Sequence, residues 1–152
     1  MDDTEPIAAY HRRCWVLAFA PLLTPGAVDR MQSQGQVDRL RSWLAPESGF
    51  VSMVAELGGI PIGHTIVSGN ELVHLFVDPN HWRQGLGRTL LKIGEGLLRD
   101  AGHSHIELHT IVGNTPAIAL YRTTGWTVSD RLVHSDHDGV AYQEHVLVKR
   151  LD

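Results

Sequence analysis

Residues 73–91 read V-H-L-F-V-D-P-N-H-W-R-Q-G-L-G-R-T-L-L. The apolar first residues predict a β-strand and the apolar last residues predict the start of a helix, with a turn between them that holds two glycines flanked by arginines. A helix that follows such a turn presents free backbone N–H groups, and the helix dipole favours negative charge at the same place. The stretch therefore predicts a strand–turn–helix unit that binds phosphate.

Two other phosphate-binding motifs do not match this turn. The chain has no glycine run followed by Gly-Lys-Ser or Gly-Lys-Thr, so it lacks a Walker loop. Leu90 stands where the dinucleotide-binding pattern has its third glycine. A G-x-G pair alone is equally typical of a tight turn without a ligand. The interpretation therefore depends on a second motif.

The second motif is residues 114–126, which read N-T-P-A-I-A-L-Y-R-T-T-G-W. In this order and at this separation the two motifs closely resemble the GNAT (GCN5-related) superfamily of acyl-CoA-dependent N-acyltransferases. The family pattern Q/R-x-x-G-x-G/A falls on residues 82–87, and the family's later asparagine and tyrosine fall on Asn114 and Tyr121. Trp82 departs from the pattern, which has Gln or Arg there. The resemblance covers roughly residues 50–130 well and the first 45 residues poorly.

The resemblance implies a single GNAT-like domain over residues 1–152, and a chain of this length with 43% hydrophobic residues has the size of one ordinary domain. The expected fold is α/β with a mixed sheet, in which an antiparallel meander is joined to a splayed pair of parallel strands with flanking helices. The pantetheine arm of acetyl-CoA is expected to lie in the opening between those two strands.

Residue patterns place the elements of this fold along the chain. An amphipathic helix is expected over residues 6–19 with Thr4 as its N-cap, and residues 27–44 are expected to form one bent helix or two short ones interrupted at Gly35. The few residues before the first helix leave little room for the family's first strand. The helix from Gly85 to Gly102 is expected to turn Lys92, Glu95, Arg99 and Asp100 outward and to pack closely on the sheet at Gly94 and Gly96. The other expected elements are strands over 50–57, 62–67, 71–77, 105–112, 126–134 and 141–149, and a helix from Thr115 to Thr124.

The resemblance assigns the cofactor to backbone groups at the phosphate turn and at the strand before it. Glycine lets a pyrophosphate approach the backbone amides of the turn. The strand backbone is expected to pair with pantetheine, and an N–H near Val77 to stabilise the oxyanion of the tetrahedral intermediate. The strand side chains themselves are typical of a core, and Asn114 is also typical of a turn or cap. The expected cofactor-binding residues are Leu75, Phe76, Val77, Arg83, Gln84, Gly85, Leu86, Gly87, Arg88 and Asn114.

Two residues are expected to carry the chemistry. By resemblance Tyr121 is the general acid for the leaving sulfur, because a phenol with a pKa of about 10 stays protonated at neutral pH. A packing role in the core is the alternative for this tyrosine. Glu71 occupies the strand position where several GNAT-like enzymes carry their base, and His74 and Glu56 are weaker candidates for the same role.

Composition narrows the partners. The net charge of −4 does not indicate sequence-independent binding to nucleic acid or to an anionic membrane surface. No apolar run is long enough to span a bilayer, and the single cysteine, Cys14, is expected to pack in the first helix; both observations favour a cytoplasmic protein. The ten histidines show no specific metal-ligand spacing, so no metal site is predicted.

The predicted activity is direct transfer of an acetyl group from acetyl-CoA to a primary amine of a small molecule or a peptide. A non-catalytic acyl-CoA-binding regulatory module is the main alternative, and a nucleotide-binding protein is a third. The sequence does not choose the acceptor, because the walls of that site are expected in the first 45 residues. A homodimer is possible, although the sequence pattern does not reveal an exposed surface that would form its interface.

Overall fold

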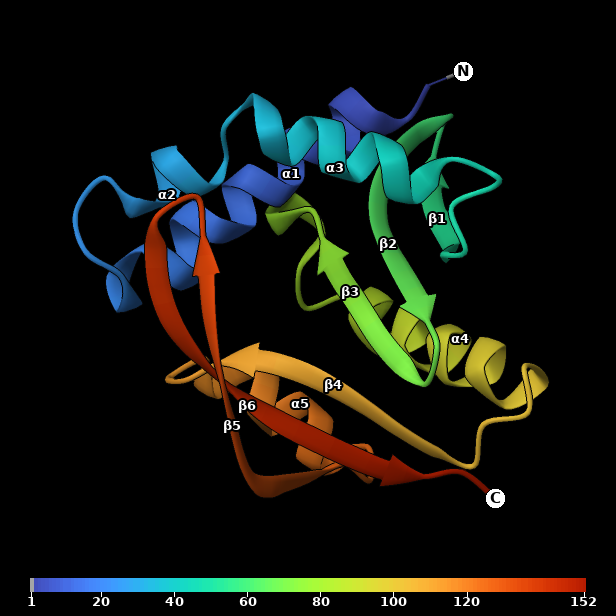
Figure 1. Cartoon of the computed structure of the whole chain (residues 1–152). Helices are drawn as coiled ribbons and strands as arrows, with labels where there is room; N and C mark the ends of the chain where they lie inside the picture. Colours follow the sequence, from blue (N-terminus) through green and yellow to red (C-terminus); the bar gives the residue numbers. More distant parts are fainter. Residues whose placement is uncertain (1) are drawn as a thin grey trace.

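A computed structural model describes residues 2–152 as one six-stranded mixed sheet with helices on both faces (Figure 1). The strands lie in the order β1-β2-β3-β4-β6-β5. Their bounds are β1 Val51–Leu57, β2 Ile60–Ser68, β3 Glu71–Val77, β4 His105–Ile111, β5 Thr127–His137 and β6 Val140–Arg150. The helices are α1 Thr4–Cys14, the π-helical η1 Trp15–Phe19, the 3₁₀ turn η2 Ala20–Leu22, α2 Ala27–Met31, α3 Gln34–Leu44, the 3₁₀ turn η3 Pro79–His81, α4 Leu86–Asp100 and α5 Thr115–Thr123.

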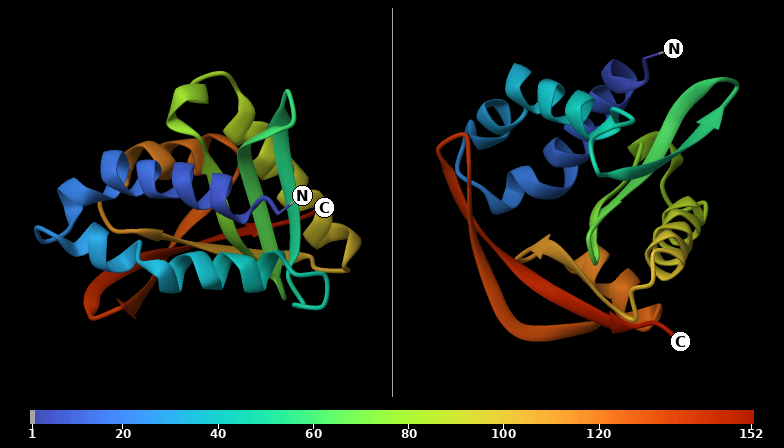
Figure 2. Two further views of the ribbon diagram at one scale, coloured as in Figure 1. Left: turned by 90° about the horizontal axis from the view of Figure 1, so that it is seen from above. Right: turned by 45° about the vertical axis from the view of Figure 1, so that its right-hand side comes forward.

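The β3–β4 pair is the one parallel contact of the described sheet, and it is short. β3 and β4 are paired only through Glu71 with Glu107 and Leu72 with Leu108. Beyond that point β4 follows β6, to which it is paired along its whole length. Figure 2 shows the two halves of the sheet diverging from this place. The predicted mixed sheet with a splayed parallel pair is confirmed.

Helices α1 and α3 cover one face of the β1–β3 half, and α4 covers the other (Figure 2). Ile7, Tyr10 and Leu40 form the core under α1 and α3. The larger core lies between α4 and the second half of the chain, where Tyr121 and Trp126 join the leucines of α4. The tip of the β5–β6 hairpin reaches across to α2, where Val140 packs on Met31.

The ends of several helices and strands differ from the predicted ones for local reasons. Thr4 lies inside α1 rather than capping it, because the Asp2 carboxylate accepts the Thr4 N–H (2.9 Å). The break between α2 and α3 comes at Gln32 and Ser33, and Gly35 lies within α3. The last hairpin turns at Asp138 and Gly139, so both strands are longer than predicted. In the described residues no strand precedes α1, as expected from the short N-terminal segment.

Two glycines in α4 differ in their surroundings. A Cβ at Gly94 would lie 2.9 Å from Leu72 Cδ1 and 2.9 Å from Thr65 Oγ1, so the predicted close packing on the sheet is confirmed there. A Cβ at Gly96 would meet nothing within 4 Å, so the same prediction is wrong for Gly96. The outward orientation predicted for Glu95 is also wrong, because its side chain is buried against Lys149.

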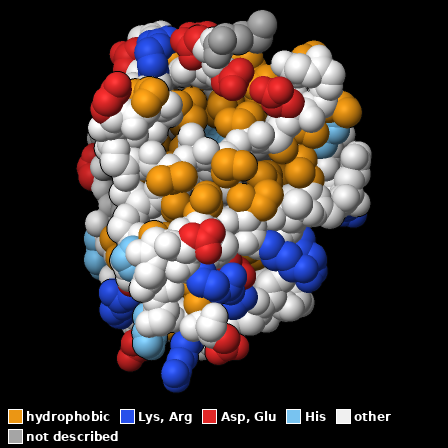
Figure 3. Space-filling view, turned by 90° about the vertical axis from the view of Figure 1, so that its right-hand side faces the viewer, with side chains coloured by type: hydrophobic (Ala, Val, Ile, Leu, Met, Phe, Trp, Pro, Cys, Tyr) orange, Lys and Arg blue, Asp and Glu red, His pale blue; other side chains and the backbone are white. Residues whose placement is uncertain are grey.

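The edge strand β1 carries exposed hydrophobic side chains, among them Val51, Met53 and Leu57. Figure 3 shows hydrophobic groups gathered on this side of the molecule. Dimerisation stays a prediction. In the described part of the chain, none of the helices is both long and apolar enough to span a membrane.

Candidate active site

The turn before α4 has the backbone of an anion-binding loop. Arg83 and Gly85 both adopt positive φ angles, of 62° and 83°, which reverses the chain twice in three residues. Gly85 is the N-cap of α4 and supplies no capping side chain. The first backbone bond of the helix runs from the Thr89 N–H to the Gly85 carbonyl (3.1 Å). The N–H groups of the first turn, residues 86–88, therefore have no intrahelical acceptor and are available to a phosphate.

Gly87 lines the cleft beside this turn, and nothing in the protein itself requires a glycine there. Its φ is not positive, and an added Cβ would lie 3.9 Å from Val77 Cγ2 and 3.9 Å from Leu120 Cδ2. These are ordinary contact distances. The absence of a side chain at Gly87 therefore leaves room on the cleft side rather than relieving strain.

The register of the sheet turns alternate backbone groups of β3 toward the opening. The Asp78 N–H donates to the Ile62 carbonyl of β2 (2.8 Å). Because bonded pairs alternate in an antiparallel ladder, Phe76 also bonds to β2. Leu75 and Val77 then direct their backbone groups to the opposite edge of β3. At these residues β4 is no longer paired with that edge. Of the three predicted strand residues, Leu75 and Val77 present backbone to the opening, and Phe76 contributes its side chain.

The same alternation holds on the far side of the opening. The N–H of Val112, just after β4, donates to the carbonyl of Gln143 in β6 (2.9 Å), which assigns the even-numbered residues of β4 to bonds with β6. His109 and Ile111 consequently turn their backbone toward β3. Two strand edges that are not paired with each other therefore face across the opening.

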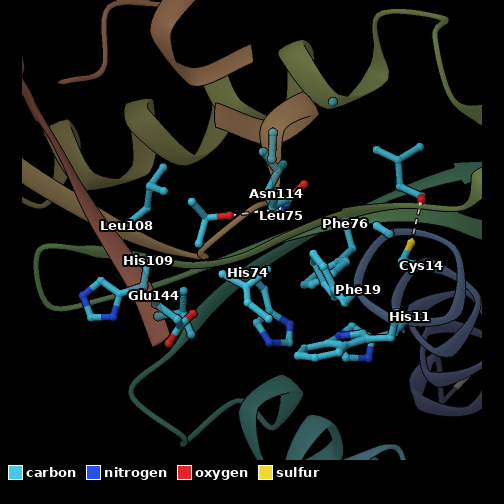
Figure 4. Close-up of a pocket in the computed structure, with 18 of the residues that line it drawn as sticks. His11, Cys14, Phe19, His74, Leu75, Phe76, Leu108, His109, Asn114 and Glu144 are labelled. Carbon is cyan, nitrogen blue, oxygen red and sulfur yellow. Dashed lines mark hydrogen bonds between the residues drawn. The ribbon is translucent and has the colours of Figure 1, made fainter. Parts of the chain in front are cut away.

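Trp82 and Cys14 both bond to the end of β3. The Trp82 indole N–H donates to the Val77 carbonyl (2.8 Å), and the Cys14 thiol donates to the same oxygen (3.1 Å; Figure 4). Trp82, which departs from the family pattern, therefore fastens the phosphate turn to the strand. Cys14 is buried as predicted, and burial raises the pKa of its thiol to about 12.

A cleft of about 990 Å³ runs through the opening from the phosphate turn to the β5–β6 hairpin. Near the turn its wall includes Arg83 and Gly87. Its other end, here called the acceptor end, lies between α3 and the hairpin and includes Gln36, Arg39, Trp43, Glu71, His74, His109, Asp136, His137, Tyr142 and Glu144. Figure 4 shows His74, His109 and Glu144 within this close-up of the cleft.

Tyr121 and Asn114 reach the cleft from α5 and from its first turn. Tyr121 is buried, and burial raises the pKa of its phenol to about 12, so the hydroxyl is protonated at neutral pH. Asn114 is the N-cap of α5, and its amide nitrogen donates to Thr110 Oγ1 (3.3 Å), which leaves its side-chain oxygen for another partner. Both residues therefore line the cleft from the same side.

Glu71 lines the acceptor end beside two titratable side chains, His109 and Glu107. Its Oε1 lies 3.8 Å from His109 Nδ1, and His109 Nε2 lies 3.3 Å from Glu107 Oε1. Arg131 bonds the other oxygen of Glu107 (2.7 Å). Burial raises the pKa of Glu71, while the nearby His109 acts in the opposite direction. Glu56, one of the two weaker candidate bases, is exposed on β1 and does not line the cleft.

A buried row of side chains behind the acceptor end was not predicted. The Tyr10 hydroxyl lies 2.6 Å from His64 Nδ1, and His64 Nε2 lies 3.3 Å from His74 Nδ1. His11 stacks on His74 with 5.2 Å between ring centroids. Burial lowers the pKa of His64 to about 3 and that of His74 well below its usual value, so both rings are neutral at pH 7. The alternation of residues in the strands did not indicate this row, because a histidine at a strand position is also typical of a surface residue.

The arrangement defines a fold with an opening in its sheet and, at one end of that opening, a helix whose first N–H groups have no intrahelical acceptor. A family model described as "Acetyltransferase (GNAT) family" matches residues 11–126, and the chain belongs to this family. The predictions of family and fold class are thereby confirmed. Among residues 2–152, no three His, Cys, Asp or Glu side chains are placed to share a metal ion.

Curated relatives agree with this family, and a solved structure agrees with its fold. The chain is 34% identical to mycothiol acetyltransferase of Clavibacter sepedonicus over 80% of its own length and 38% of that protein. It is 28% identical to the ribosomal protein bS18 alanine N-acetyltransferase of Escherichia coli over 83% of the chain and 77% of that protein. The crystal structure of PaiA N-acetyltransferase from Thermoplasma acidophilum in complex with coenzyme A superposes with a TM-score of 0.81, at 18% identity, over 98% of this chain and 93% of that one. The chain spans about half the length, or less, of the first curated relatives it matches.

Proposed function

We propose that this chain is an N-acetyltransferase that moves an acetyl group from acetyl-CoA to a primary amine by direct attack. The observation that carries the proposal is the parting of β3 and β4 beside the free amides of α4. This opening gives pantetheine an unpaired strand edge to bond to, and it gives the diphosphate a helix N-terminus. A solved neighbour that holds coenzyme A supports the same cofactor.

In the proposed reaction a neutral amine attacks the thioester carbonyl carbon, and a tetrahedral oxyanion forms. The N–H groups of Leu75 and Val77 face the opening and supply donors for that oxygen and for pantetheine. Collapse of the intermediate breaks the carbon–sulfur bond, and Tyr121 donates its proton to the leaving sulfur. Glu71 takes the proton that the amine loses. The phenolate and the carboxylic acid then return to their resting forms by exchange with solvent.

The direct test is thiol release from acetyl-CoA in the presence of a panel of amines and peptides. The proposal predicts amine-dependent release with formation of the acetamide. Tight CoA binding without release for any acceptor would instead support a non-catalytic acyl-CoA-binding module. Poor competition of CoA against ATP or NAD would support a nucleotide-binding protein.

Tyr121→Phe is expected to lower kcat by about tenfold or more while CoA affinity stays nearly unchanged, because the ring still fills its place and only the proton donor is lost. Steady-state kinetics together with calorimetric titration of CoA measure the two quantities. Equal kcat for both proteins would assign the phenol a packing role, and the leaving thiolate would then be protonated by water.

The fall of kcat/KM at low pH is expected to reflect protonation of Glu71. A base works when deprotonated, so kcat/KM rises as the pH passes upward through its pKa, and burial moves that pKa toward neutrality. An acceptor amine with a pKa well below 7 removes the titration of the amine itself from the profile. With such an acceptor, Glu71→Gln is expected to flatten the acid limb. A limb that persists in the variant would assign the base to another group.

A further inference from the structure

Arg39 is a cation at the acceptor end without an acidic partner. Its Nη1 donates to Gln36 Oε1 (2.8 Å) and lies 2.7 Å from His137 Nε2. Among residues 2–152 no carboxylate pairs with it, although Arg41 on the same helix pairs with Asp38. Burial, and then the charge of Arg39, lowers the pKa of His137, so this neighbour does not add a second positive charge at neutral pH.

Half of the Arg39 guanidinium is unused. In the described chain, the hydrogen bonds of this side chain all leave from Nη1, and the N–H groups on Nε and Nη2 have no protein acceptor. The Nε–Nη2 side of a guanidinium matches the two oxygens of a carboxylate. Gln36 is buried and holds Nη1 in place, so the free side is oriented before any ligand arrives.

Glu71, Asp136 and Glu144 line the acceptor end, and each has a partner other than Arg39. Glu144 Oε1 accepts from the Ser135 hydroxyl (3.0 Å), and Asp136 Oδ1 accepts the Gly139 N–H (3.0 Å) in the hairpin turn. Neither forms an ion pair with Arg39. The cation therefore remains available to a ligand in the cleft.

His74 offers a second hydrogen-bond donor. In the described chain the only hydrogen-bond partner of the Tyr10 hydroxyl is His64 Nδ1, so Tyr10 donates and His64 carries its proton on Nε2. His64 then donates to His74 Nδ1, and neutral His74 must hold its own proton on Nε2. His74 lines the cleft, and Arg39 is close enough that its charge contributes to the lowered pKa of His74. His74, weighed as a base from sequence, consequently presents an N–H rather than a lone pair.

We propose that the acceptor end binds a carboxylate of the acceptor through Arg39, with the His74 N–H as a second donor. The inference rests on the proposed function and narrows its acceptor class to amines that also carry a carboxylate, which are amino acids and their derivatives. Polyamines and aminoglycosides have no group for Arg39. The amine of such an acceptor lies toward Glu71, in the same cleft.

The test compares carboxylic acids with their matched carboxamides. A series of amino acids from glycine to 6-aminohexanoate, each paired with its amide, is assayed for kcat/KM with wild-type protein, Arg39→Gln and Arg39→Lys. The wild type is expected to prefer the best acid over its amide by about tenfold or more, because a charged hydrogen-bonded pair is lost with the amide. Arg39→Gln is expected to abolish the preference and Arg39→Lys to retain part of it. Arg41→Gln, on the outer side of α3, is the matched control and keeps the full preference.

Binding separates failure of this inference from failure of the proposed function. The same acids and amides are titrated calorimetrically into CoA-loaded protein, and circular dichroism checks that each variant is folded. Acetylation of acids and amides at equal kcat/KM would overturn the carboxylate site while the acetyltransferase stands. Arg39-dependent binding of acids without turnover would retain the site and overturn the enzyme. Equal binding of both members of each pair, in wild type and Arg39→Gln alike, would also overturn the site.

Discussion

Substituting valine for Gly87 is expected to weaken CoA binding by about 100-fold, which corresponds to about 2.7 kcal/mol. Gly87 lines the cleft in the first turn of α4, where the free N–H groups point. A branched side chain there would keep the diphosphate away from those amides, because its two γ-carbons would occupy the space beside the first turn of the helix. Calorimetric titration with CoA measures the loss.

Two controls make the Gly87 result specific. Gly87→Ala is expected to bind CoA almost normally, since its Cβ meets neighbours only at 3.9 Å and the family pattern accepts alanine at this position. Gly96→Val introduces the same side chain into the same helix, where an added Cβ meets nothing within 4 Å. It should retain CoA affinity. Unchanged affinity in a folded Gly87→Val protein would remove the start of α4 from the cofactor site.

Lys149→Met is expected to lower the free energy of unfolding by about 3–5 kcal/mol, because it leaves a buried carboxylate without its partner. Lys149 Nζ lies 2.9 and 3.0 Å from the two oxygens of Glu95 and donates to the Thr124 carbonyl (2.7 Å). The Trp126 indole N–H also donates to Glu95 (2.9 Å). This network joins α4 to the end of α5 and to β5 and β6. Urea unfolding followed by circular dichroism measures the change.

Arg41→Met provides the comparison for this network. Arg41 pairs with acids on an exposed surface, so its loss is expected to cost about 1 kcal/mol or less. Adding Glu95→Gln to Lys149→Met should recover part of the stability, because the uncompensated charge is removed. Similar losses for Lys149→Met and Arg41→Met would show that the buried pair adds nothing beyond a surface pair.

Local sequence was sufficient to predict the structure of the proposed cofactor half of the site. The phosphate turn depends on a strand, a left-handed glycine and a helix within one short stretch, so residues 73–91 carry the whole unit. The Asn114 and Tyr121 pair is local in the same sense, because one turn and one short helix position both residues. The parallel arrangement of β3 and β4 followed from the helix that connects them.

The acceptor end depended on contacts between distant segments. No sequence pattern pointed to Arg39, and it lines the cleft because the β5–β6 hairpin brings His137 against it. A register shift at Ile66 and Val67 of β2 lets Glu71 and His74, which are three residues apart, both line the cleft. Strand alternation alone would place residues three apart on opposite faces.

The sequence by itself determined the family, the order of the elements and the phosphate turn, because these follow from hydrophobic periodicity and from glycines that act on their immediate neighbours. Tertiary structure alone decided the burial of Glu95, the tautomer chain from Tyr10 to His74 and the unpaired charge of Arg39. The physical reason is that burial and pairing are properties of the space around a side chain. That space is built by segments as far apart in the chain as α1, β2 and the last hairpin.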